Sequence, residues 1–146
     1  MTHLENTIII KQSIDVVYEL SENIEKFPEY MPHVKKSVIT KKQSNKKHVA
    51  MSAIISGIKS SWASESITKK NKSIKYNQLE GSCKVMRGEW VFEKVTEGTK
   101  ITIIHDFDLG WPIIGKLLSP TLVKHWVHKY CNLTLKAIKD KAELLN

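Results

Sequence analysis

The chain has 146 residues, of which 41% are hydrophobic, and its formal net charge is +8. This length predicts a single domain, residues 1–146. The polar residues 1–6 argue against a signal peptide, and the lack of an apolar run of roughly 20 residues argues against a membrane span. We therefore expect a cytoplasmic protein. Arg87 is the only arginine among 23 basic residues. This argues against nucleic-acid binding, because base edges and phosphates favour the fork-shaped guanidinium group of arginine. The positive charge still allows weak peripheral contact with an anionic membrane.

The N-terminal part of the chain predicts one strand and two short helices. Residues 7–11 form a β-branched run that is typical of a strand. Ser13 is placed to cap a helix, because hydrophobic residues recur at helical spacing over 16–24. Pro28 and Pro32 then break the chain into short helices.

From His33 onward the hydrophobic pattern alternates and predicts six strands. We expect them at 34–40, 48–55, 58–68, 73–80, 84–95 and 100–109, joined by a polar turn at 41–47, a tight turn at Gly57 and further polar turns. Strands at hairpin spacing form an antiparallel sheet. The lysine pairs, including 46–47, are interpreted as solvated strand ends.

The C-terminal part predicts a loop and one long helix. The apolar loop 110–115 begins and ends with glycine and is interpreted as a gate over a pocket. The helix is expected from about Leu117 to Leu145. Its apolar stripe is predicted to hold Leu122, Trp126, Tyr130, Leu133 and Ala137. The predicted fold is therefore α+β, with a curved antiparallel sheet of about seven strands wrapped around a long C-terminal helix and an internal cavity between them.

Strand parity predicts which side chains face that cavity. Aromatic side chains with one polar tip suit an aromatic or polycyclic ligand. Gly88, inside a strand, indicates either close approach by a ligand or another backbone, or a β-bulge. The predicted ligand-binding residues are Met51, Trp62, Ser66, Met86, Gly88, Trp90, Ile103, Phe107, Trp111, Trp126 and Tyr130. For Met51 and Ile103, simple core packing is the better explanation.

His105 is the strongest candidate for chemistry because it lies mid-strand on the apolar face. Burial keeps a histidine neutral, so it can remove a proton α to a ketone while Ser64 or Tyr76 donates to the enolate oxygen. The alternative is a core histidine satisfied by a hydroxyl group. Asp106 does not pair with His105 in this interpretation, because neighbours on a strand point to opposite faces.

Neither a metal site nor a cofactor is predicted. Cys83 and Cys131 are the only cysteines, have no metal-motif spacing and are expected to be reduced thiols. His125 and His128 share a helical face, but no third ligand accompanies them.

Several strings occur in the same order as in a known family. They are residues 13–18 (SIDVVY), 23–28 (NIEKFP) and 62–65 (WASE), followed by Met86, Trp90, 98–99 (GT) and 106–107 (DF). In these strings the chain resembles the START-like (helix-grip) superfamily and, within it, the polyketide cyclase/dehydrase (aromatase) group; it is also similar to coenzyme Q-binding START-like proteins. The resemblance implies a cavity for a hydrophobic ligand, with either cyclisation and dehydration of a poly-β-keto chain or binding without chemistry.

One position departs from the resemblance. Some polyketide aromatases similar to this chain carry a cavity arginine at the position that falls on Ser66 here, and Arg87 is predicted to face outward because it alternates with Met86 and Trp90. Three functions remain open. They are a cyclase/dehydrase with His105 as base, a non-catalytic lipid or quinone carrier, and a domain that binds proteins or ribosomes through its lysine-rich exterior. The oligomeric state is not indicated.

Overall fold

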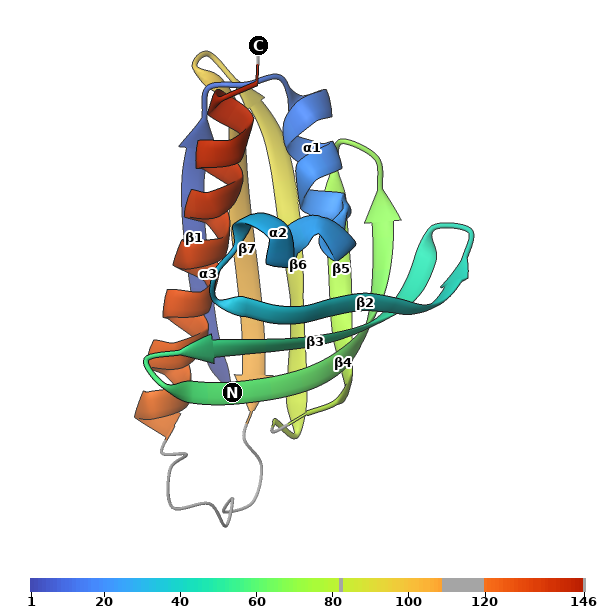
Figure 1. Cartoon of the computed structure of the whole chain (residues 1–146), viewed down its shortest axis with the longest axis vertical. Helices are drawn as coiled ribbons and strands as arrows, with labels where there is room; N and C mark the ends of the chain where they lie inside the picture. Colours follow the sequence, from blue (N-terminus) through green and yellow to red (C-terminus); the bar gives the residue numbers. More distant parts are fainter. Residues whose placement is uncertain (82, 109–119, 146) are drawn as a thin grey trace.

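A computed structural model describes residues 1–81, 83–108 and 120–145 of the chain (Figure 1). Seven antiparallel strands form one sheet in the order β1-β7-β6-β5-β4-β3-β2. Their bounds are β1 Thr2–Ile10, β2 Val34–Gln43, β3 Lys46–Ile55, β4 Ile58–Lys69, β5 Ser73–Glu80, β6 Val85–Val95 and β7 Gly98–Asp108. The helices are α1 Ile14–Glu22, the 3₁₀ turn η1 Ile24–Lys26, α2 Phe27–Tyr30 and α3 Pro120–Glu143. The predicted α+β architecture is confirmed.

The sheet is strongly curved. In Figure 1, β1, β7 and β6 run alongside α3, whereas β2, β3 and β4 cross its direction. The strand that begins the chain pairs with the last strand, from Thr2 opposite Phe107 to Ile10 opposite Thr99. Because α3 also packs along β1, the first strand and the last helix lie side by side, whereas the two termini lie at opposite ends of the molecule (Figure 1).

Local sequence signals account for the first helix and the β3–β4 turn. Ser13 accepts a hydrogen bond from the backbone N–H of Val16 and caps α1, as predicted. Ser56 and Gly57 have φ of 52° and 79°, so both central residues of the β3–β4 turn adopt the left-handed conformation that a tight hairpin requires.

Three strands, β1, β2 and β3, are longer than the sequence predicts. β1 begins at Thr2 rather than residue 7, and its polar part is held at the sheet edge by pairing with β7 and by the contact of His3 Nδ1 with Asp106 (2.7 Å). The predicted turn 41–47 is present but shorter, because β2 continues to Gln43 and β3 starts at Lys46, which leaves the turn at residues 44–45. Polar residues on exposed strand faces hide such extensions from a hydrophobic pattern.

The buried face of α3 differs from the predicted stripe. It consists of Val123, Val127, Cys131, Thr134, Leu135, Ile138 and Ala142. Leu133 is 38% exposed, so its assignment to the stripe is wrong. Trp126 and Tyr130 are half-buried, because they lie beside the packed face and border a cavity. The helix therefore presents a packing face along its length and a second apolar flank near its beginning.

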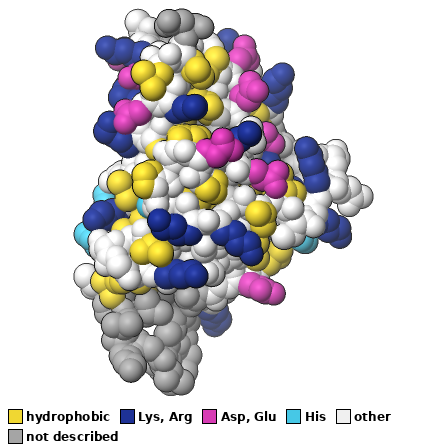
Figure 2. Space-filling view, in the orientation of Figure 1, with side chains coloured by type: hydrophobic (Ala, Val, Ile, Leu, Met, Phe, Trp, Pro, Cys, Tyr) yellow, Lys and Arg dark blue, Asp and Glu magenta, His cyan; other side chains and the backbone are white. Residues whose placement is uncertain are grey.

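On the face shown in Figure 2, hydrophobic side chains are interspersed with lysines and carboxylates rather than gathered in one patch. No helix in the described part of the chain is long and apolar enough to cross a membrane. The predicted gate 110–115, with Trp111, and the predicted helix start at Leu117 lie outside the described residues.

Candidate ligand pocket

A cavity of about 220 Å³ lies between the concave face of the sheet, α3 and the segment α1–η1–α2. A cavity of about 150 Å³ is enough to hold benzene. The interior therefore has room for a molecule of about two fused rings, and the hollow centre predicted from the sequence is present.

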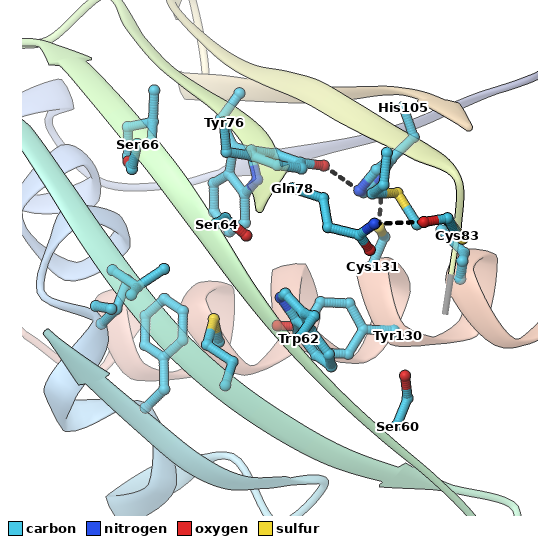
Figure 3. Close-up of a pocket in the computed structure, with 18 of the residues that line it drawn as sticks. Ser60, Trp62, Ser64, Ser66, Tyr76, Gln78, Cys83, His105, Tyr130 and Cys131 are labelled. Atoms are coloured by element: carbon cyan, nitrogen blue, oxygen red, sulfur yellow. Dashed lines mark hydrogen bonds between the residues drawn. The ribbon is translucent and has the colours of Figure 1, made fainter. Parts of the chain in front are cut away.

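One strand runs along the whole cavity. Alternate residues of β4 line it, and they are Ser60, Trp62, Ser64, Ser66 and Thr68 (Figure 3). Because side chains alternate along a strand, this set shares one face. β4 therefore gives the cavity a polar hydroxyl track interrupted by one indole.

The opposite wall is aromatic. The rings of Trp126 and Tyr130 on α3 stack with centroids 5.7 Å apart and an interplanar angle of 3°. Trp62 meets both edge-on, at 6.1 Å and 5.4 Å. The indole N–H of Trp126 donates to the backbone oxygen of Ile58 (3.0 Å), which fixes the stack. A flat aromatic ligand finds matching faces here.

The strand register places polar residues in one row across the sheet. Lys47 on β3 is opposite Ser66 on β4, which is opposite Tyr76 on β5. Tyr76 is in turn opposite Gly88 on β6, and Gly88 is opposite His105 on β7. Side chains directly opposite each other lie about 5 Å apart at Cβ. The row therefore brings an ammonium, a hydroxyl, a phenol and an imidazole to one level of the pocket.

His105 is held between two partners. Its Nε2 is hydrogen-bonded to the hydroxyl of Tyr76, and its Nδ1 lies 3.3 Å from the sulfur of Cys131 (Figure 3). The Tyr76 and His105 rings meet edge-on with centroids 5.2 Å apart. The described chain thus forms a phenol–imidazole–thiol cluster that faces the cavity.

Burial keeps all three members of this cluster uncharged. It lowers the pKa of His105 to about 4, against an opposing effect of Asp106. Burial also raises the pKa of Tyr76 well above its ordinary value, with smaller contributions from Cys131, Tyr130 and Asp106. The pKa of the Cys131 thiol is raised by burial as well. At neutral pH the cluster is a set of neutral hydrogen-bonding groups.

Gly88 serves this cluster rather than a ligand. A Cβ atom built on Gly88 would stand 2.3 Å from the Tyr76 hydroxyl oxygen and 2.6 Å from the backbone oxygen of Ile104. No side chain fits there, so the missing Cβ makes room for the Tyr76 ring to reach His105. The predicted close approach is present, but the group that approaches is a side chain of the protein.

Lys47 corrects the interpretation of the lysine pairs as solvated strand ends. It is 5% exposed and lines the cavity. Its ammonium donates to the carboxylate Oε1 of Glu22 (2.8 Å) and to the backbone oxygen of Glu22 (3.1 Å), at the C-terminal end of α1. A cation is favoured there by the helix dipole.

The structure brings most of the predicted site residues to the cavity. Those that line it are Met51, Trp62, Ser64, Ser66, Tyr76, Met86, Trp90, His105, Trp126 and Tyr130. Ile103 and Phe107 do not line it; they are 1% exposed and belong to the packed core. Arg87 is exposed on the outer face, as predicted.

Several lining residues escaped the sequence analysis, among them Lys47, Cys83 and Cys131. Lys47 alternates with Val49 and Met51, a signal that is available once β3 is known to start at Lys46. The Gln78 amide donates to the backbone oxygen of Cys83 (2.6 Å), a contact between chain segments that no local pattern reveals. Both cysteines are free thiols.

The buried histidines predict a loss of stability in acid. His33, whose Nε2 lies 2.9 Å from Thr134 Oγ1, has its pKa lowered to about 4 by burial and by Lys35, as burial does for His105. The unfolded chain, with histidine pKa values of about 6.5, takes up protons first as the pH falls. We expect the free energy of unfolding to be highest above pH 6.5 and to decrease toward pH 4. Urea denaturation across this range should give a smaller decrease for His105→Gln than for the wild type; equal slopes would contradict this.

Comparison with known proteins gives a family and a fold. The sequence profile described as "Polyketide cyclase / dehydrase and lipid transport" matches residues 10–122. No curated protein sequence matches the chain. Among solved structures, the Zhui aromatase/cyclase from Streptomyces sp. R1128 is similar with a TM-score of 0.88 and 22% identity, over 97% of this chain and 93% of that chain. A protein from Thermus thermophilus reaches 0.86 and 22% over 98% of both chains. A START superfamily protein from Mycobacterium smegmatis reaches 0.79 and 14% over 99% of both. These likenesses establish the helix-grip fold.

Proposed function

Because the chain belongs to the polyketide cyclase/dehydrase and lipid transport family, we propose that its cavity binds a hydrophobic aromatic or polycarbonyl molecule and promotes cyclisation and dehydration of that molecule. The observation that carries this proposal is the Tyr76–His105–Cys131 cluster on the cavity wall. A non-catalytic carrier needs no buried polar cluster in its cavity wall. Because burying polar groups costs free energy unless they are fully paired, a cluster that is kept there supports a role in chemistry.

In this proposal Tyr76 is the residue that contacts the substrate. The Cys131 thiol donates to Nδ1 of His105, and Nε2–H of His105 donates to the Tyr76 oxygen. The Tyr76 hydroxyl hydrogen is then free to donate to a carbonyl oxygen in the cavity. His105 acts as a positioning residue behind Tyr76 rather than as the direct base expected from the sequence, because its Nε2 is occupied.

The chemistry asked of the protein is modest. A poly-β-carbonyl chain enolises readily, since its α-hydrogens lie between two carbonyl groups. Its enol carbon attacks a carbonyl carbon whose oxygen accepts a hydrogen bond from Tyr76, and a preorganised donor at that oxygen stabilises the developing charge. The carbonyl π bond breaks, the enol hydroxyl releases its proton to solvent, and the new alkoxide takes up a proton to give a β-hydroxy ketone. Loss of the remaining α-hydrogen and of the hydroxyl group as water completes the dehydration. The aromatic wall of Trp62, Trp126 and Tyr130 holds the chain folded. Ser64, one row further along β4, is a second donor.

A non-catalytic lipid or quinone carrier is the second candidate. The observation that favours it is the pocket's lack of an arginine: Ser66 occupies the position discussed above, and Arg87, the only arginine of the chain, lies on the outer face. A carrier needs the cavity and its aromatic wall but not the Tyr76 donor.

Ligand binding itself is tested with a neutral bicyclic ketone, 2-acetylnaphthalene. We expect saturable one-to-one binding in calorimetry, and Trp62→Ala to weaken it on the order of tenfold, because an aromatic contact is lost. The matched control is Leu79→Ala, since Leu79 is 50% exposed and does not line the cavity. Native mass spectrometry of freshly purified protein should also reveal a copurifying small molecule. Absence of both results would refute the binding proposal.

A further inference from the structure

The charged end of the cavity suggests what the ligand carries. Lys47 and Glu22 both line the cavity, and their side chains are 6% and 33% exposed. A buried ion pair is weak evidence for stability, since apolar residues of similar volume often serve as well or better. A lysine kept in an otherwise apolar cavity wall therefore calls for a reason beyond folding.

The ammonium group of Lys47 does not use all of its hydrogen-bond donors. An ammonium group has three donors. Two of them reach Glu22, and within the described residues the ammonium has no other protein partner. Ser66, opposite Lys47 in the strand register and 6% exposed, places a hydroxyl beside it on the cavity wall. Ser21 does not compete, because its hydroxyl donates to the backbone oxygen of Val17 (2.8 Å).

We propose that Lys47, with Ser66, binds an anionic end group of the ligand, so that the cavity takes an amphipathic aromatic carboxylate or similar acid. This inference rests on the proposed function of the cavity and adds the chemical class of its ligand. The anion displaces the partly exposed Glu22 carboxylate, which turns toward water. The aromatic body of the ligand then lies against Trp62, Trp126 and Tyr130.

The same row sets the orientation of the ligand. Lys47 and Tyr76 flank Ser66 on either side. Neighbouring strands are about 4.8 Å apart, so the acid group at Lys47 lies on the order of 10 Å from a carbonyl at Tyr76. A ligand that carries an acid at one end and a ketone further along its chain matches both groups.

The test compares two probes of the same shape, 2-naphthoate and the neutral ketone 2-acetylnaphthalene, by calorimetry. The wild-type protein is expected to prefer the acid. Lys47→Met, which keeps an unbranched side chain of similar volume, should lower that preference by about tenfold, because a charge-assisted hydrogen bond is lost. Glu22→Gln removes the competing carboxylate and should raise the affinity for 2-naphthoate severalfold.

Opposite effects of the two substitutions distinguish a binding role from a structural one, since a merely structural ion pair would be damaged in the same way by either. Lys46→Met is the matched control, because Lys46 is the neighbouring lysine and its side chain is 52% exposed. If the ketone binds but Lys47→Met leaves the acid preference unchanged, the inference is overturned and the proposed function stands. If neither probe binds the wild type, the inference is overturned, and the proposed function falls with it when no small molecule copurifies either. Should Lys47→Met fail to fold, Glu22→Gln decides: equal or weaker binding of 2-naphthoate overturns the inference.

Discussion

Replacing Tyr76 with phenylalanine is expected to slow cyclisation of a thioester-activated poly-β-ketone by about 10²–10³-fold, the usual cost of removing one donor from a developing oxyanion. The substitution deletes one hydroxyl group, and with it the hydrogen bond to His105 Nε2, but leaves the ring and its edge-on packing against His105 in place. Substrate affinity should change much less than the rate. The measurement is single-turnover formation of the cyclised product, followed by chromatography.

Tyr30→Phe is the control for this experiment. The Tyr30 hydroxyl is also buried, has no hydrogen-bond partner within the described residues and lies outside the cavity lining, so its removal should leave the rate unchanged. A normal rate in Tyr76→Phe would remove the cluster from the mechanism. If the wild type binds the substrate without converting it, the carrier function is the one that remains.

Replacing Phe107 with alanine is expected to lower the free energy of unfolding by about 3–5 kcal/mol, with little effect on ligand affinity. Phe107 is 1% exposed and lies in the core cluster on β7, so truncation leaves a cavity that the neighbouring strands cannot close. Urea denaturation gives the stability, and calorimetry with 2-acetylnaphthalene gives the affinity.

The control for Phe107 is Met51→Ala, because Met51 is also buried but borders the cavity. We expect that substitution to affect ligand affinity more than Phe107→Ala does. If Phe107→Ala abolished binding while stability stayed the same, Phe107 would belong to the ligand site, as the sequence pattern alone indicates.

Phe107 also illustrates how far the sequence can predict this site. Alternation on β7 places Ile101, Ile103, His105 and Phe107 on one face, and all four are buried. Alternation cannot say which of them meets a void and which meets another side chain. That depends on where α3 lies over the sheet, and the position of α3 is set by contacts with β1 and α1 from the other end of the chain.

Polar residues are harder to place from the sequence. The sequence predicts that Lys47 belongs to a hydrophilic turn, because lysines surround it. In the structure the register of β3 turns it inward toward Glu22. The sequence predicts that Leu133 belongs to the apolar stripe of α3, but it lies on the exposed side of that helix. The first is fixed by a tertiary contact and the second by which side of α3 packs on the sheet, and neither is visible in a local pattern. The topology, in contrast, is predictable because hairpin turns and strand alternation are local signals.

The pairing of β1 with β7 has a consequence for how the chain folds during its synthesis. During synthesis the first strand emerges with no partner and must wait until some ninety later residues have left the ribosome. Contacts between distant parts of a sequence slow folding, because the loop between them must close before the contacts repay its entropy. The site for the guest molecule is consequently among the last features to be completed, and a nascent chain halted before α3 has no finished cavity to fill.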